Sequence, residues 1–174
     1  MPLESGSLPT AGGLPSGAIS YHFAIIDAPD VVAANNFISL FNPAASGKNY
    51  VFLEAHIGTY AVSNTTNASS MAMYRVSAAS GGTLATAIAR YDTSKIVSTA
   101  EIRTGNPTVT RTTGVPAMPI TPAVATGAGG NASTTLQVTP GTNYLLRPGE
   151  GIVFGTASGD TNQRWNIDLI WAEY

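Results

Sequence analysis

The end of the chain, from Arg164 to Tyr174, alternates between apolar and polar side chains. On an extended backbone, one side would carry Trp165, Ile167, Leu169 and Trp171, and the other Arg164, Asn166, Asp168 and Ala172, with Ile170 the one apolar exception. A repeat of two residues is typical of a half-buried β-strand, whereas a helix would scatter the same side chains around its circumference. The chain is therefore predicted to end on a strand that has a large apolar face to bury.

Short apolar runs separated by turns continue this pattern through the rest of the chain. Turns such as Arg147–Gly151 contain Pro148, which presets φ, and Gly149, which tolerates positive φ. The pattern predicts roughly eight to ten short strands and no helix. The predicted strands are residues 21–26, 36–41, 50–60, 71–76, 95–103, 144–146, 152–154 and 164–174, with 84–91 either strand or irregular. Residues 105–135 are rich in proline and glycine, and we expect them to be open and to work at a surface or an interface.

These features predict one all-β domain, a single antiparallel β-sandwich over residues 20–174, with a jelly roll as the expected topology. An extended N-terminal arm, residues 1–19, precedes it. Its prolines and glycines leave only the isolated apolar side chains of Leu3, Leu8 and Leu14, which cannot build a core. The arm is either an ordinary disordered tail or a segment whose leucines dock on a neighbouring surface.

Composition narrows the classes of function. The formal net charge is −2 with no cluster of one sign, which argues against nucleic acid and against an anionic membrane surface as partners. The absence of cysteine excludes disulfides, thiolate chemistry and cysteine zinc sites. No apolar run is long enough to span a membrane, and the first residues do not read as a signal peptide.

No arrangement of residues predicts catalysis. Glu54 and His56 lie two apart on one strand face, which is enough for two metal ligands or an acid–base pair, but a polar outward face is the favoured interpretation. Asp160, Asp168 and Glu150 would offer carboxylates for Ca²⁺ if they lined one end of the sandwich, although no spaced calcium loop supports such a site. We therefore expect a protein that is not an enzyme, with no catalytic, cofactor-binding or metal-binding residues and no cofactor.

Two segments resemble recurring parts of small structural proteins of tailed-bacteriophage virions. They are Phe41–Asn49, followed by a long apolar strand, and Leu146–Ile152, which leads into the closing aromatic strand. The resemblance implies a jelly-roll β-sandwich that decorates the head as a cement protein or belongs to the tail, forms homotrimers and has no catalytic residues. It also implies synthesis in the host bacterial cytoplasm, a final location at the virion surface, and the major capsid protein or another virion protein as partner.

Outward apolar side chains are the candidate contacts for such assembly. In the strand at 50–60, Val51, Leu53, Ala55 and Ile57 are predicted to face inward, and Tyr50, Phe52, Glu54 and His56 outward. The candidate assembly contacts are Leu3, Leu8, Leu14, Tyr50, Phe52, Ile170 and Tyr174. Two hypotheses stay open. The chain is a capsid decoration protein that binds and stabilises the phage head surface, or it is a tail-tip, fibre or lectin-like module that binds a host-surface glycan through exposed aromatic residues.

Overall fold

A computed structural model describes residues 14–30, 35–61, 71–90, 96–114, 118–120, 131–137, 144–156 and 163–174. The strands are β1 (Ile19–Pro29), β2 (Asn36–Phe41), β3 (Tyr50–Ala61), β4 (Met71–Ser80), β5 (Thr83–Leu84), β6 (Ala89–Arg90), β7 (Glu101–Thr104), β8 (Thr108–Arg111), β9 (Met118–Ile120), β10 (Asn131–Gln137), β11 (Leu145–Leu146), β12 (Gly151–Thr156) and β13 (Gln163–Glu173). None of the described residues belongs to a helix that is long and apolar enough to cross a membrane.

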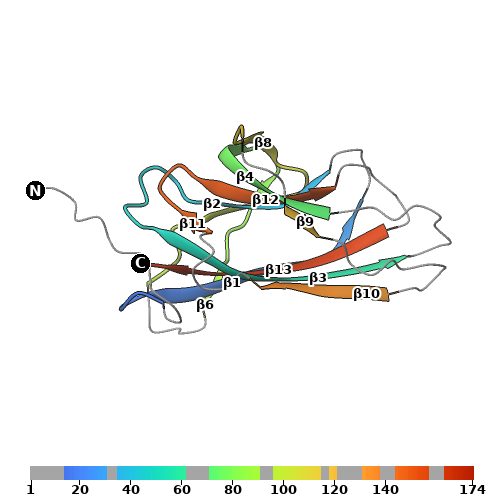
Figure 1. Cartoon of the computed structure of the whole chain (residues 1–174), viewed down its shortest axis with the longest axis horizontal. Helices are drawn as coiled ribbons and strands as arrows, with labels where there is room; N and C mark the ends of the chain where they lie inside the picture. The colour runs from blue at the N-terminus through green and yellow to red at the C-terminus, as the bar shows by residue number, and fades with distance from the viewer. Residues whose placement is uncertain are drawn as a thin grey trace, which may run out of the picture.

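The strands form two antiparallel sheets that pack face to face around one core (Figure 1). Sheet A has the order β10-β3-β13-β1-β6, with β11 also paired to β3. Sheet B has the order β5-β7-β2-β12-β4-β8, with β9 also paired to β4. The chain alternates between the sheets, since β1, β3, β10 and β13 lie in sheet A and β2, β4 and β12 in sheet B. Strands far apart in the sequence are thus neighbours, and the fold is a β-sandwich of jelly-roll topology, as predicted.

The predicted alternation of the last strand is confirmed. Trp165, Ile167, Leu169 and Trp171 are fully buried, while Ile170 and its polar neighbours on the other face are only partly buried. β13 pairs with β1 along one edge and with β3 along the other, so this strand is the centre of sheet A. Aromatic contacts join it and its neighbours to sheet B, where the ring of Phe37 lies 5.9 Å from that of Trp165.

The prediction that Tyr50 and Phe52 face outward is wrong, because both side chains are fully buried in the core. The cause is a β-bulge in β3, where Leu53 has no opposite residue in β13. An extra residue moves every side chain before it to the other face of the strand. Tyr50 and Phe52 therefore face the core, as Ala55 does after the bulge.

Two predictions for the middle of the chain differ from the structure, one for residues 105–135 and one for residues 96–100. The prediction of an open segment at 105–135 is wrong for its described residues, because β8 and β9 pair with β4, and β10 pairs with β3. The segment 96–100, predicted as part of a strand, has no strand assignment, and regular pairing begins only with β7. Before β1, a turn in which the Ala18 N–H donates to the Pro15 carbonyl oxygen (3.0 Å) ends the predicted arm.

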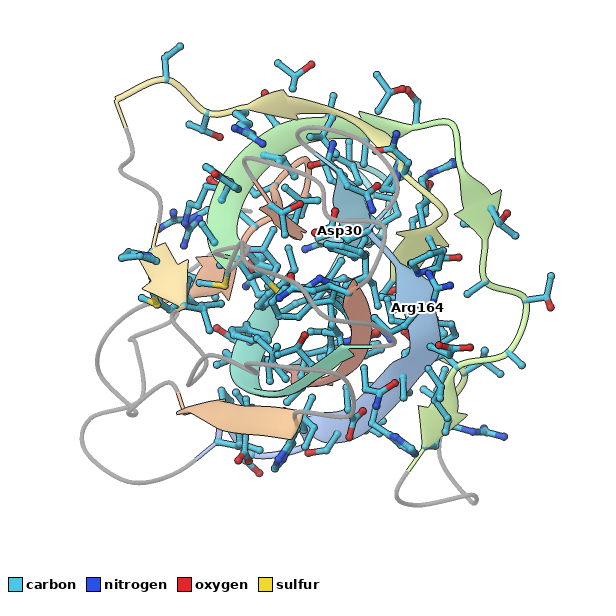
Figure 2. The ribbon with its side chains drawn as sticks, turned by 90° about the vertical axis from the view of Figure 1, so that its right-hand side faces the viewer. Asp30 and Arg164 are labelled. Carbon is cyan, nitrogen blue, oxygen red and sulfur yellow. The ribbon has the colours of Figure 1, made fainter. Side chains whose placement is uncertain are left out.

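The two ends of the sandwich hold different elements. At one end, which we call the C-terminal end, β2 and β13 end and β1, β3 and β12 begin. The loop 42–49 and the turn 147–150 also lie there. At the other end, which we call the opposite end, β1, β3 and β12 end and β2, β4 and β13 begin. Figure 2 looks onto this opposite end, near Asp30 and Arg164.

Candidate functional sites

The candidate assembly contacts have different surroundings. Leu14 lies before β1 with 41% of its surface exposed, whereas Ile170, on the outer face of sheet A, and Tyr174 are partly buried. Leu3 and Leu8 lie outside the described residues. Because Tyr50 and Phe52 belong to the core, they offer no surface for assembly.

The two histidines share the outer face of sheet A with two carboxylates. His56 Nε2 lies 3.2 Å from Glu54 Oε1, as their spacing in the sequence predicts. The sheet adds a carboxylate that the sequence did not place, because Asp168 pairs with His56 across β13 and β3, and its Oδ1 lies 3.6 Å from His22 Nδ1. Within the described ranges, however, no group of three such side chains converges to hold a metal ion. Pairs this exposed contribute little to stability and amount to a polar sheet face.

Of the three carboxylates considered for Ca²⁺, the two described ones, Glu150 and Asp168, are not brought together. Glu150 lies in the turn before β12, where its Oε2 accepts a hydrogen bond from the Arg147 N–H (2.9 Å) and pairs with Arg75 (3.4 Å). Asp168 lies on the outer face of sheet A, in a different strand and sheet. Asp160 is outside the described residues. Because Glu150 serves to close its own turn, it is not available as part of a shared cation site with Asp168.

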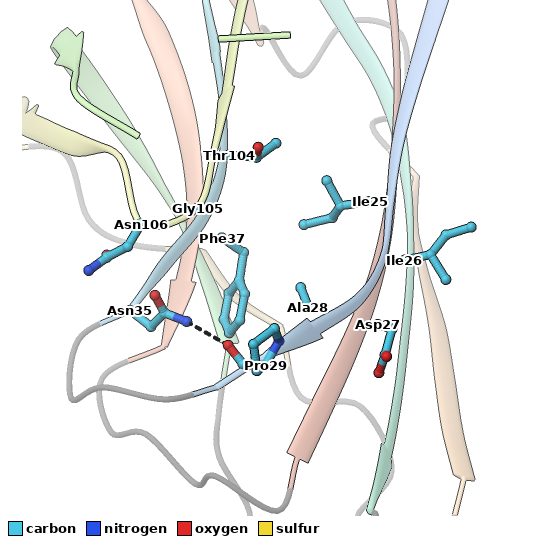
Figure 3. A pocket seen from close by; sticks show the side chains of 10 residues that line it. All are labelled: Ile25, Ile26, Asp27, Ala28, Pro29, Asn35, Phe37, Thr104, Gly105 and Asn106. Carbon is cyan, nitrogen blue, oxygen red and sulfur yellow. Dashed lines mark hydrogen bonds between the residues drawn. The ribbon is translucent and has the colours of Figure 1, made fainter. Parts of the chain in front are cut away.

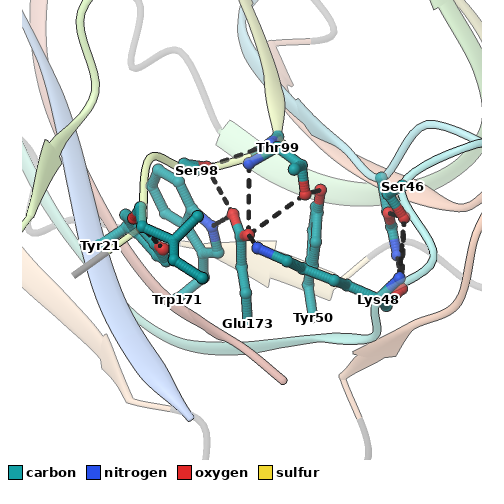
Figure 4. A network of polar contacts seen from close by, with 11 residues as sticks. Tyr21, Ser46, Lys48, Tyr50, Ser98, Thr99, Trp171 and Glu173 are labelled. Carbon is teal, nitrogen blue, oxygen red and sulfur yellow. Dashed lines mark hydrogen bonds and ion pairs between the residues drawn. The ribbon is translucent and has the colours of Figure 1, made fainter.

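Glu173 forms a buried polar network at the C-terminal end (Figure 4). Its side chain is only 1% exposed. Its Oε2 pairs with Lys48 Nζ (2.9 Å) and accepts hydrogen bonds from the Thr99 N–H and hydroxyl (both 3.2 Å). Its Oε1 accepts hydrogen bonds from the Ser98 hydroxyl and from Trp171 Nε1 (3.3 Å). Both carboxylate oxygens are therefore occupied by donors from three separate parts of the chain.

This network fixes the segment 96–100 across the end of the sandwich. The Tyr50 hydroxyl shares a hydrogen bond with Thr99 (2.8 Å), and the Tyr21 hydroxyl donates to the Ile96 carbonyl oxygen (2.7 Å). Burial raises the pKa of Tyr50 well above its ordinary value of 10.0, and burial is also the largest cause of the raised pKa of Tyr21. A buried charge is tolerated only when its partners satisfy it. Because both oxygens of Glu173 accept hydrogen bonds and the side chain is closed to solvent, the network holds these strands and segments together.

One sequence signal would have identified Glu173. It continues the inward side of the alternation that contains Leu169 and Trp171, so the same reasoning predicts a carboxylate directed at the core. A carboxylate in that position requires buried donors. Its donors could not be named from the sequence, because Lys48 and Thr99 lie 125 and 74 residues away.

A second network joins the two segments that carry the resemblance to virion proteins. Asn42 is fully buried, and its Nδ2 donates to the carbonyl oxygens of Lys48 (2.8 Å) and Leu146 (2.9 Å). Its backbone N–H donates to the Glu150 carbonyl oxygen (2.9 Å), and its own carbonyl oxygen accepts from the Gly149 N–H (2.8 Å). The loop 42–49 and the turn 147–150 therefore form one hydrogen-bonded unit at the C-terminal end.

An apolar cleft opens at the edge of the sandwich near the opposite end (Figure 3). We call it the edge cleft; its volume is about 450 Å³, and its walls are Ile25–Pro29 of sheet A and, from sheet B and its loops, Asn35, Phe37 and Thr104–Asn106. Ile25, Ala28 and Phe37 point into the cleft, whereas Ile26, which is 80% exposed, points away from it. A pocket of this size and lining is suited to apolar side chains.

Comparison of the chain with family models, curated proteins and solved structures finds no match. The fold and the two kinds of candidate site are therefore interpreted from the chain's own residues. Of these sites, the polar networks are structural, whereas the edge cleft is an open pocket with room for an apolar group.

Proposed function

We propose that this chain is a non-enzymatic structural protein of a bacteriophage virion, acting as a capsid decoration (cement) protein that binds and stabilises the head surface. The observation that carries the proposal is the use of Glu173. A buried carboxylate is the kind of group that an enzyme uses for acid–base chemistry. Here both of its oxygens accept hydrogen bonds from neighbouring segments, and the side chain is closed to solvent. Polar groups used in this way suit a subunit whose task is to remain folded within an assembly.

The two segments that resemble virion proteins support the same proposal. Asn42 connects them through three hydrogen bonds, to Leu146, Gly149 and Glu150, so the matching residues belong to one structural element rather than to two unrelated turns. A similarity confined to turn-forming residues would not require the two turns to be in contact. The two segments are therefore neighbours at one end of the sandwich, which supports treating them as one feature of the resemblance.

Glycan binding, the rival function, has less support. Sugar rings bind by stacking on exposed aromatic side chains. The large apolar side chains that are exposed in the described residues are Leu14, Ile26, Leu84, Ile96 and Val97, none of them aromatic. Phe37 lines the edge cleft but is only 3% exposed. The aromatic side chains at the described surface, such as Tyr74 and Tyr174, are only partly exposed, which gives glycan stacking less support.

A cryo-EM map of the phage particle that carries this chain tests the proposal directly. We expect density for the jelly roll on the outside of the head, at repeated positions over the major capsid protein. Density confined to the tail tip or fibres would favour the glycan-binding alternative, and absence from the particle would refute a virion role.

The arm provides a second test of attachment. Deletion of residues 1–18 is expected to leave the melting temperature nearly unchanged but to reduce retention on purified heads. A matched full-length control replaces Leu3, Leu8 and Leu14 with serine, which removes the apolar contacts and keeps the chain length. Full retention of both variants would show that the arm is an ordinary tail.

Light scattering tests the homotrimer that the resemblance implies. It should give about three times the chain mass of 17.9 kDa if the trimer forms in solution.

A further inference from the structure

The edge cleft has rigid walls that belong to both sheets. On the side of sheet B, Asn36 donates from its N–H to Asn106 Oδ1 (3.0 Å) and from its Nδ2 to the Pro107 carbonyl oxygen (3.0 Å). Across the bottom of the cleft, Asn35 Nδ2 donates to the Pro29 carbonyl oxygen (3.2 Å), which links β1 to the start of β2 (Figure 3). Because these bonds already hold the walls, an occupant would not have to order them.

The backbone beside the cleft is also open. Along the edge of β1 that faces away from β13, β6 pairs with Tyr21 and His22, and no other described strand pairs with β1 there. A bulge between Ile25 and Ala28, with Asp27 at a φ of 58°, interrupts the regular ladder on the other edge. A bulge makes a long added strand unfavourable. The site therefore suits a short extended peptide that inserts one apolar side chain.

The chain itself contains a segment of matching chemistry. Residues 5–13 carry no charge, and Leu8 stands between Ser7 and Pro9 as their one large apolar side chain. The charged group at the rim of the cleft is Asp27, whose Oδ1 lies 3.4 Å from Arg164 Nε. A neutral segment with an isolated leucine fits a mainly apolar cleft of this kind, and the neighbouring proline reduces the entropy lost on binding.

The distance along β1 favours binding of the arm to the cleft of a neighbouring copy, rather than to the cleft of the copy that carries the arm. The described chain begins at Leu14, just before the start of β1 at the C-terminal end, whereas the cleft is lined by the last residues of β1. Figure 1 shows that β1 runs along the length of the sandwich. The six residues from Leu14 back to Leu8 reach at most about 21 Å when extended, whereas the cleft residues Ile25–Pro29 lie about 20–33 Å along β1 from its first residue, Ile19. An arm that followed its own β1 would also meet β6, which already occupies that edge. A second copy placed head to tail presents its cleft without this obstacle.

From these features we propose that Leu8 of one copy occupies the edge cleft of a neighbouring copy, between Ile25, Ala28 and Phe37. The proposal rests on the proposed function, for which it names the partner of the arm as a second copy of this chain. The contact is heterologous, since arm and cleft are different surfaces, and three such contacts related by a threefold rotation close a ring. Closure makes each contact intramolecular and strengthens all three.

Disulfide trapping tests this occupant, because the natural chain has no cysteine. The full-length variants Leu8→Cys and Ala28→Cys are mixed at high micromolar concentration and oxidised, and dimers are measured on a non-reducing gel. The matched control mixes Leu8→Cys with Ala24→Cys, since Ala24 is an exposed β1 residue that does not line the cleft. We expect about tenfold or more dimer with Ala28→Cys than with the control, because bound arms raise the local thiol concentration.

The double variant Leu8→Cys/Ala28→Cys separates the remaining outcomes. Loss of its free thiols without dimer formation, together with no excess dimer in the mixture, would show that the arm fills its own cleft and would overturn the proposal. No excess in either experiment would also overturn it and would leave the cleft to a different partner. Either result is independent of the cryo-EM test, because a decoration protein does not need this particular contact.

Discussion

Trp171 and Trp165 lie on the same face of β13 and are both fully buried, yet their surroundings differ. Near the C-terminal end, the ring of Trp171 stacks on Tyr21 with 5.9 Å between ring centroids, and its Nε1 donates to Glu173 (3.3 Å). Near the opposite end, Trp165 packs on Phe37, and its Nε1 has no hydrogen-bond partner among the described residues. The two ends of the core therefore differ in whether the buried tryptophan N–H donates a hydrogen bond.

Other buried polar side chains at the two ends differ in hydrogen bonding in the same way. At the opposite end, Thr59 Oγ1 and Gln163 Oε1 are also buried and find no hydrogen-bond partner within the described part of the chain. At the C-terminal end, Glu173 and Asn42 use their polar atoms to bind loops to strands. Buried polar atoms that lack partners reduce stability, whereas satisfied networks make a region rigid. We infer that the C-terminal end provides most of the polar stabilisation, and that the opposite end carries the cleft for a partner.

The largest expected effect concerns Glu173. Glu173→Ala leaves Lys48 and the other donors of the network without their acceptor, and should lower the free energy of unfolding by about 3–5 kcal/mol. Asp168→Ala is the control, because that side chain is 33% exposed and lies 3.6 Å from His22; its removal should cost about 0–1 kcal/mol. Urea unfolding measures both values. Equal losses of unfolding free energy in the two variants would show that the buried network stabilises the fold no more than the exposed pair does.

A matched pair of tryptophan substitutions compares the two ends directly. Trp171→Phe removes a donor to the buried Glu173, whereas Trp165→Phe removes an N–H that has no partner. Both changes remove a similar volume, so the first should cost about 1–3 kcal/mol more than the second. Thermal and urea unfolding of the two variants give the difference. A larger loss for Trp165→Phe would reverse the comparison.

Two residues with positive φ test the turns at each end. Gly149, at a φ of 86°, has open space around the position of a Cβ, so Gly149→Ala should cost about 1–2 kcal/mol through backbone strain alone. At the opposite end, Asp27→Gly relieves the strain of a φ of 58° but removes an exposed pair with Arg164. The net change should lie within about 0.5 kcal/mol. Calorimetry that found Asp27→Gly the more harmful would show that the bulge depends on the Asp27 side chain.

At neutral pH, Tyr50→Phe is expected to cost much less than Glu173→Ala: it removes the hydrogen bond to Thr99 and should lower the free energy of unfolding by about 0.5–1.5 kcal/mol. Burial raises the pKa of Tyr50 in the folded state, so its contribution is complete below its ordinary pKa of 10.0 and is lost as the pH rises above that value. Stability should therefore fall in alkali, and Tyr50→Phe should fall less steeply. Parallel pH curves for the natural chain and the variant would contradict this.

The local order of the chain was well predicted because it depends on neighbouring residues. The predicted strand at 36–41 coincides with β2, and the strand at 164–174 corresponds to β13, since side-chain alternation and turn residues act over a few positions. The same rules failed at Tyr50 and Phe52. The bulge at Leu53 depends on how β13 pairs with β3, and no local pattern contains that information.

The sequence by itself determined that this chain folds as an antiparallel sandwich whose last strand is buried on one face, because short-range alternation and turn chemistry are written in consecutive residues. Only the tertiary structure decided which residues satisfy Glu173, how Asn42 joins two distant turns, and where the edge cleft opens. Each of these depends on pairings across large separations, such as the 125 residues between Lys48 and Glu173. A buried charge or a cleft is defined by what surrounds it, and those surroundings exist only after the sheets have packed.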